Sequence, residues 1–184
     1  MSISRCSSAQ EILRTQDTVA ALRRTGWAVD VLAPRVTPML TAALGSDAGL
    51  YTVPRLPGRR IAMFVKGFAL VSRRDYCVLH GFDEGAGMAR AIARAVFRRV
   101  AYIAEIHHPE TVGDATLEGA SAVILSDESA LAGFRKPPPM ARVSILPDPH
   151  AELADNAFTA AEYSEAIGGI YGYVLSTPCE RRRR

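Results

Sequence analysis

The stretch Val100-Ala-Tyr-Ile-Ala-Glu-Ile-His-His-Pro-Glu110 places a short apolar run directly before two histidines, a proline and an acid. Similar apolar runs recur along the chain. They alternate with segments in which apolar residues repeat every three or four positions, as they do in helices. This alternation is typical of α/β proteins with a parallel sheet. The sequence therefore predicts a Rossmann-like, three-layer α/β/α fold with a mostly parallel sheet of about seven strands.

The boundaries of these segments come from apolar runs, capping signals, glycines and prolines. Strands are expected at residues 2–5, 27–33, 50–53, 76–80, 100–106, 122–125 and 143–146. Helices are expected at 8–25, 38–44, 59–72, 84–99 and 128–134, and a last one begins at Thr159. Ser8 with Glu11, and Thr159 with Glu162, have the spacing of a capping box, which marks a helix start.

Length and composition are those of one globular domain. The chain has 184 residues, of which 48% are hydrophobic and 22% are charged, and a disordered chain would be less apolar. The net charge of +3 includes four arginines at 181–184, so the rest of the chain is near −1. This balance does not favour nucleic acid as a partner. The arginine run is interpreted as a solvated end with at most weak attraction for phosphate-rich partners.

The start of the chain indicates a cellular location, and the spacing of the cysteines indicates their chemical state. Residues 1–16 lack the apolar core of a secretory signal, and no apolar run approaches the roughly 20 residues that span a bilayer, so a cytoplasmic location is expected. Cys6, Cys77 and Cys179 are far apart and odd in number, which favours plain thiols over a zinc site or a redox pair.

Polar residues gather where two predicted strands end. His80 ends the strand at 76–80 and Asp83 follows it, while His107, His108 and Glu110 follow the strand at 100–106. In open α/β sheets, ligands bind outside the carboxyl ends of the strands, near the point where strand order reverses. An imidazole can accept a hydrogen bond from a hydroxyl group, and a carboxylate can orient that group. The pattern predicts a site for an alcohol, with His80, Asp83 and Glu110 binding substrate.

Purely structural roles for the same residues remain open. The histidine pair can cap its strand by bonding backbone carbonyls. No metal site is expected, because zinc needs three or four converging ligands and no helical pair or cysteine pair supplies them. Arg90, Arg94 and Arg98 form a basic ridge at helical spacing, which is either a solvated helix face or a weak contact with an anionic membrane surface.

Four segments resemble the amino-terminal, acceptor-side domain of glycosyltransferase family 4, whose members have the GT-B fold. They are residues 20–33, 75–83, 100–110, and 119–126 together with 142–149. The resemblance holds over roughly residues 8–150 and implies a Rossmann-like domain at 1–150 with a histidine of acceptor-side importance at His107 or His108. His108 fits the family pattern better, because Pro109 and Glu110 follow it. The first loop, residues 5–10, departs from the family because it contains no glycine to cradle a phosphate.

The carboxyl-terminal part resembles the last helix of the same family. Residues 158–171 are similar to the helix that crosses back to the first domain in complete enzymes, yet only eight residues separate Pro149 from Phe158. The resemblance therefore implies that the nucleotide-sugar-binding domain is missing and the chain is truncated relative to the family. It assigns 151–177 to a linker with a crossover helix that packs on the same domain, and 178–184 to a disordered basic tail.

These observations lead to three hypotheses about function. The resemblance implies the acceptor-side half of a hexosyltransferase-like enzyme, acting on a sugar or lipid-linked acceptor and inactive without a separate donor-binding subunit. This chain would bind no cofactor itself, and a nucleotide sugar belongs to the complete enzyme. The second hypothesis is a non-catalytic binding protein, a homodimer through the surface that a donor half would cover. The third is a nucleotide-binding α/β enzyme of another family.

Overall fold

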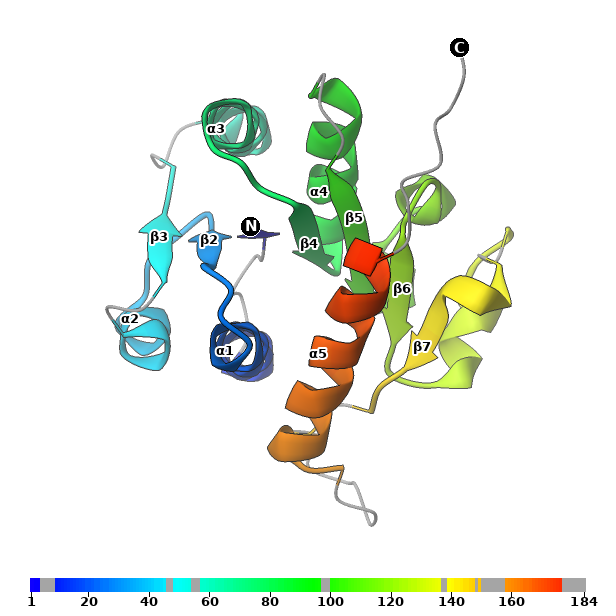
Figure 1. The fold of residues 1–184 in the computed structure, drawn as a ribbon. Coiled ribbons are helices and arrows are strands. Elements are labelled where there is room, and N and C mark those ends of the chain that lie inside the picture. Colours follow the sequence, from blue (N-terminus) through cyan, green and yellow to red (C-terminus); the bar gives the residue numbers. More distant parts are fainter. Residues whose placement is uncertain are drawn as a thin grey trace.

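The fold is a single parallel sheet with helices on both faces (Figure 1). The computed structural model describes residues 1–3, 9–45, 48–53, 57–96, 100–136, 139–147, 149 and 158–176. Its seven strands run in the order β3-β2-β1-β4-β5-β6-β7, and every neighbouring pair is parallel. The predicted Rossmann-like α/β fold is thereby confirmed.

The strands are short and the helices between them carry most of the length. The strands are β1 Ser2–Ile3, β2 Asp30–Leu32, β3 Gly49–Tyr51, β4 Val78–Phe82, β5 Ala101–Ile106, β6 Ala122–Leu125 and β7 Val143–Ile145. The α-helices are α1 Ala9–Arg24, α2 Pro38–Leu44, α3 Arg59–Arg73, α4 Glu84–Ala95 and α5 Ala160–Ser176. Four short 3-10 helices complete the described part: η1 Pro109–Thr111, η2 Asp114–Leu117, η3 Glu128–Gly133 and η4 Met140–Arg142.

Strand β4 lies further along the chain than the sequence suggested. The prediction that the strand ends at His80 is wrong, because pairing with β5 continues until Phe82 lies opposite Glu105. Gly81 looked like a strand end, but it is a strand residue over which α4 passes closely: a Cβ on it would lie 2.4 Å from the Cα of Ala86. His80 therefore sits in the middle of β4.

Two other elements differ from their predictions. Strand β2 begins only at Asp30, whose carboxylate binds Arg74 and Tyr76, rather than at residue 27. The segment 128–134 is the 3-10 helix η3 and not an α-helix. The predictions for Cys6, Cys179, the Ser8 cap, Arg98, the linker 151–157 and the tail 178–184 lie outside the described residues.

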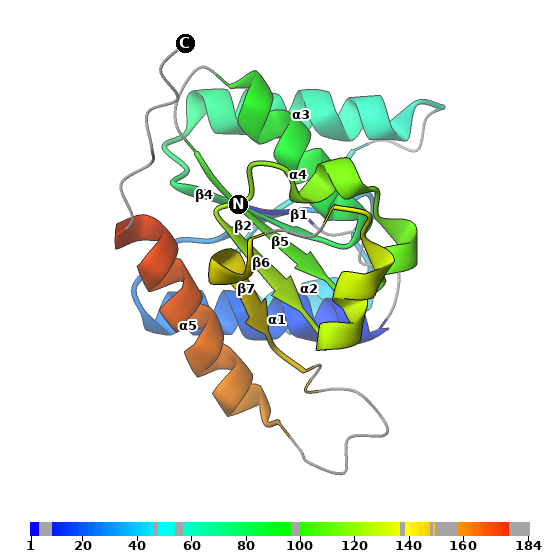
Figure 2. The same ribbon diagram turned by 90° about the vertical axis from the view of Figure 1, so that its right-hand side faces the viewer.

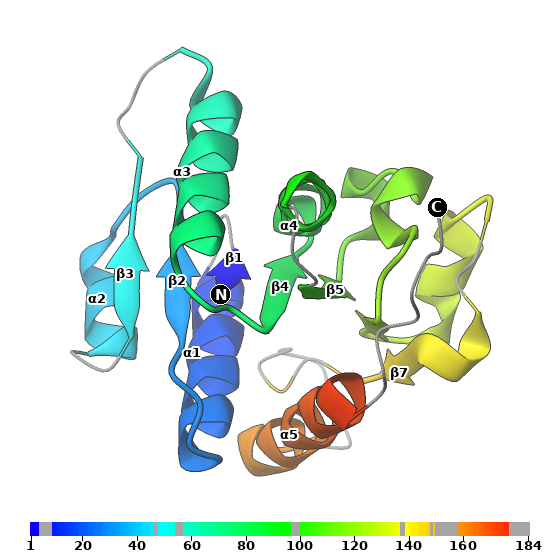
Figure 3. The same cartoon turned by 45° about the horizontal axis from the view of Figure 1, so that its top comes forward.

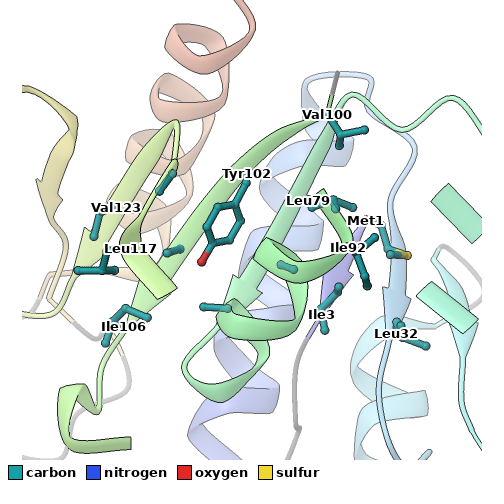
Figure 4. Packing of buried hydrophobic residues seen from close by; sticks show 14 of the residues in the cluster. Met1, Ile3, Leu32, Leu79, Ile92, Val100, Tyr102, Ile106, Leu117 and Val123 are labelled. Atoms are coloured by element: carbon teal, nitrogen blue, oxygen red, sulfur yellow. The ribbon is translucent and has the colours of Figure 1, made fainter. Parts of the chain in front are cut away.

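The two faces of the sheet carry different helices. Helices α3 and α4 cover one face, and α1, α2 and α5 cover the other (Figures 1 and 3). The α3/α4 side holds an apolar core that includes Ile3, Leu79, Ile92 and Val123 (Figure 4). On the opposite side, α5 lies against α1, as the turned view also shows (Figure 2).

Helix α5 begins with the predicted capping box. The backbone N–H of Thr159 donates to Glu162 (2.8 Å), and the N–H of Glu162 donates to the hydroxyl oxygen of Thr159 (3.2 Å). Its inward face includes the buried residues Tyr163, Ile167, Tyr171 and Val174. Among the described residues, no helix combines the length and the apolar character needed to cross a bilayer.

Candidate functional site

The carboxyl ends of β4 and β5 lie next to the point where the strand order of the sheet reverses. Strand order reverses at β1, which pairs with β2 on one side and with β4 on the other. Ser2 of β1 lies beside His80, and Phe82 of β4 lies beside Glu105 of β5. Crevices beside such a reversal are where open α/β sheets bind ligands.

Glu105 is the centre of a buried polar network at these strand ends. Its side chain is 0% exposed. The oxygen Oε1 accepts hydrogen bonds from the hydroxyl of Tyr163 (2.8 Å) and from Nε2 of His107 (2.7 Å). The other oxygen, Oε2, lies 3.0 Å from Nε2 of His80, although the two atoms are not aligned for a straight hydrogen bond. One carboxylate thus joins two strands and α5.

The protonation of Glu105 follows from this setting. Burial alone would raise the pKa of Glu105, but the hydrogen bond from His107 and the close approach of the His80 ring outweigh burial and hold the pKa well below its usual value. Burial and the nearby charge of Glu105 raise the pKa of Tyr163 well above its usual value, so its hydroxyl stays protonated and donates. The network therefore contains an ionised carboxylate inside the protein.

His80 connects this carboxylate to the other end of α5. Its Nδ1 lies 2.9 Å from the hydroxyl of Tyr171, and its ring stacks on Phe82 with centroids 4.5 Å apart. Burial and the charge of Glu105 raise the pKa of Tyr171, which keeps that hydroxyl protonated. If Tyr171 donates to Nδ1, the proton of the His80 ring lies on Nε2, facing Glu105.

Helix α1 adds a polar inner face to the same region. The hydroxyls of Thr18 and Tyr163 are 3.3 Å apart, and both side chains are buried. Arg14 is also buried, and its Nη2 lies 3.8 Å from Oδ2 of Asp83. Buried charged groups require such partners, because desolvation of an unpaired charge is costly.

Asp83 holds the turn that follows β5. Its Oδ1 accepts hydrogen bonds from the backbone N–H groups of His107 (2.7 Å) and His108 (2.9 Å). Asp83 also has a positive φ of 43°, which is unusual for a residue with a Cβ. Its carboxylate is therefore engaged in shaping the loop.

The predicted site residues divide into a buried and an exposed group. His80 and His107 share Glu105 and are 0% and 4% exposed. His108 and Glu110 lie at the surface, 58% and 70% exposed, with Nδ1 and Oε1 3.5 Å apart. His80 and His107 thus lie together on Glu105 inside the protein, while Glu110 faces outward beside His108.

Sequence reasoning missed the acid and the tyrosines that organise the network. Glu105 interrupts an otherwise apolar strand, and an acid in that position is the one local signal that could have singled it out. Tyr163 and Tyr171 fit an apolar stripe of α5 by their rings, but their hydroxyls belong to the polar network. Arg14 and Thr18 interrupt the apolar face of α1 in the same way.

Two other predicted features are placed by the structure. Arg90 and Arg94 both bind Glu118, at 3.3 Å for Arg94, so this part of the basic ridge is paired with an acid. Within the described ranges, no three His, Cys, Asp or Glu side chains are arranged to hold a metal ion.

The architecture defines a class of fold, a Rossmann-like α/β domain with a seven-stranded parallel sheet. Among solved structures, the chain is similar to the crystal structure of Acinetobacter baumannii MurG, a GT-B glycosyltransferase, with a TM-score of 0.62 and 13% identity. The match covers 85% of this chain and 46% of that one, so the chain spans about half the length of MurG. At this identity the likeness shows the fold alone. No protein family model and no curated protein matches the sequence.

Proposed function

We propose that the chain is the acceptor-side half of a GT-B sugar-transfer enzyme related to glycosyltransferase family 4, and that a separate subunit binds the nucleotide sugar. The observation that carries this proposal is the match in which 85% of the chain corresponds to 46% of MurG. The reaction of such an enzyme takes place in the cleft between two distinct domains, so the two halves can reside on separate chains.

Within this proposal, His108 and Glu110 contact the acceptor. They are exposed beyond the end of β5 and lie 3.5 Å apart, so an imidazole and a carboxylate can meet the same hydroxyl group. A neutral imidazole accepts the proton of a sugar or lipid-linked alcohol as that oxygen bonds to the anomeric carbon of the donor sugar, whose bond to the nucleoside diphosphate breaks. His80, His107 and Asp83 act as positioning residues, because their polar atoms hold the strand ends and the loop.

The test is reconstitution with a donor-binding protein. The purified chain alone should release no nucleoside diphosphate from a sugar nucleotide. Together with its donor subunit and an acceptor alcohol it should do so, and His108→Ala should lower the rate by about 100-fold, as loss of a general base does. Glu165→Ala, an exposed acid on α5, is the control and should leave the rate unchanged. Turnover by the chain alone, or full activity of His108→Ala in the complex, would contradict the proposal.

A second candidate function is a non-catalytic binding protein that forms a homodimer. The observation in its favour is that His80 and Glu105 are 0% exposed, and their polar atoms contact Tyr171 and Tyr163 of α5. Light scattering and a pull-down separate the two candidates. A stable homodimer that captures no donor-domain protein favours the binding protein, and capture of such a protein favours the split enzyme.

A further inference from the structure

A pocket beside β6 shares no residue with the strand-end network. Its volume is about 460 Å³, and η2, the segment leading into β6 and the segment leading into β7 form its walls. Ala120 precedes β6 and Arg142 precedes β7, so the pocket is at the amino ends of these strands. The volume lies in the usual range for small-molecule sites, which is roughly 300 to 1,000 Å³.

The floor of this pocket is apolar and continuous with the core. Leu117, Ala120 and Val123 are buried members of the α3/α4-side core, and Pro139 adds to the apolar lining. Leu117 and Val123 come from separate segments and lie near each other in Figure 4. An apolar group placed here would leave water for a surface that already belongs to the hydrophobic core, which is the main source of affinity in such pockets.

The acids in the lining already have partners. Glu118 binds Arg90 and Arg94, and the pKa of Glu118 is lowered by the hydrogen bond from Arg90 and by the charges of Arg90, Arg94 and Lys136. Oδ1 of Asp114 accepts a hydrogen bond from the backbone N–H of Arg135 (3.1 Å).

The lining holds two bases, Lys136 and Arg142, beside its two acids, and the partners of Glu118 outside the lining add two more positive charges. Arg142 uses Nη1 to donate to the carbonyl of Ala120 (3.2 Å), and a guanidinium has five N–H donors in all. Lys136 lies on the same rim and is exposed. Two acids therefore face four bases, counting Arg90 and Arg94, and the charge at the mouth is positive.

We propose that this pocket binds a small amphipathic anion, an acyl chain or aryl group that carries one carboxylate. The apolar part rests on Leu117, Ala120, Val123 and Pro139, and the carboxylate binds Arg142 and Lys136. The ligand is a single dissolved molecule and not the surface of a bilayer, because the site is a pocket of limited volume and not a flat face. This inference is independent of the proposed sugar transfer, since none of the pocket residues belongs to the strand-end network.

In the experiment, the full chain is titrated with decanoate at concentrations below the critical micelle concentration of decanoate. Binding is measured by calorimetry and by the shifts of amide NMR signals. Binding should saturate, and the shifted amides should include those of Leu117, Gly119, Ala120 and Lys136. Decanol, which has the same chain without the charge, should bind about tenfold more weakly. Decyl phosphate tests whether the pocket selects a carboxylate. It should bind less tightly than decanoate if the pocket selects a carboxylate, and with equal affinity if the pocket accepts anions in general. Both results support an anion-binding pocket.

Three variants complete the test. Lys136→Gln with Arg142→Gln should weaken decanoate binding by about tenfold and leave decanol binding unchanged, because the two changes remove charge and leave the apolar floor intact. Ala115→Phe, at an exposed position of the lining, should block both ligands by filling the mouth. Arg24→Gln, at the exposed end of α1, is the charge control.

Three outcomes would overturn the inference. They are equal binding of decanoate and decanol, unchanged binding by the Lys136→Gln, Arg142→Gln variant, and shifts confined to the exposed apolar residues Ile61 and Val65 of α3. Thermal unfolding of each variant shows that it remains folded, so a loss of binding reports on the pocket.

Discussion

Asp83 shows how much one residue contributes to the strand-end site. It accepts two backbone N–H groups from the loop that carries His107 and His108, and it does so at a φ of 43°. A residue with a Cβ in such a conformation is strained by about 1 to 3 kcal/mol. The hydrogen bonds and the nearby Arg14 offset that strain, so the conformation and the loop are coupled.

Substitutions at Asp83 should separate the strain from the hydrogen bonds. Asp83→Asn keeps one acceptor oxygen and should lower the free energy of unfolding least. Asp83→Ala loses the acceptor and keeps the strain, at a cost of about 2 to 4 kcal/mol. Asp83→Gly also loses the acceptor but relieves the strain, so it should be about 1 kcal/mol more stable than Asp83→Ala. Urea unfolding measures the order, and an alanine variant as stable as the glycine variant would show that the φ carries no strain.

At the scale of elements, α5 is attached to the sheet by its two buried tyrosines. Tyr163 reaches Glu105 on β5, and Tyr171 reaches His80 on β4, eight residues further along the helix. Their rings belong to the apolar face that packs against α1 and the sheet. The helix is therefore held by apolar packing along its length and by one hydroxyl near each end.

Removing each hydroxyl should loosen α5 without changing its shape. Tyr171→Phe leaves Nδ1 of His80 without its partner, and Tyr163→Phe removes a donor from Glu105, so each should cost about 1 to 3 kcal/mol of unfolding free energy. Tyr173→Phe on the exposed side of the same helix is the matched control and should change it by less than about 0.5 kcal/mol. Faster amide exchange in α5 of the first two variants alone would support this account; equal effects of all three would contradict it.

At the scale of the whole molecule, the buried carboxylate of Glu105 couples stability to pH. Its pKa is lowered in the folded protein, so its stabilising contribution is complete above the pKa of the unfolded chain and is lost as the pH falls towards the folded value. The exposed acids Glu118, Asp127 and Glu162 also have lowered pKa values, mainly because of hydrogen bonds, and add to the same acid limb.

Glu105→Gln isolates this contribution. At neutral pH the variant should be about 3 kcal/mol less stable, because the two histidines lose a charged partner in a buried site. The difference from the parent protein should shrink as the pH falls below about 4.5, where the unfolded carboxyl group becomes protonated. Urea unfolding across this pH range tests the sign, and a difference that stays constant with pH would refute the role of the Glu105 charge.

The sequence by itself determined the class of fold and most element positions. Strand runs, helical periods and the Thr159–Glu162 cap are local patterns, and each depends on residues only a few positions apart, so they could be interpreted without a structure. The boundary of β4 could not, because the ladder with Glu105 and the approach of Ala86 to Gly81 decided it.

Only the tertiary structure decided how the site is assembled. It placed the ring of His107 on Glu105 and that of His108 at the surface, a choice that two adjacent histidines leave open in the sequence. It also turned the hydroxyls of Tyr163 and Tyr171 towards partners 58 and 91 residues away. The physical reason is that a buried polar group is stabilised by whichever donors or acceptors the packed elements bring to it, and no local pattern records those partners.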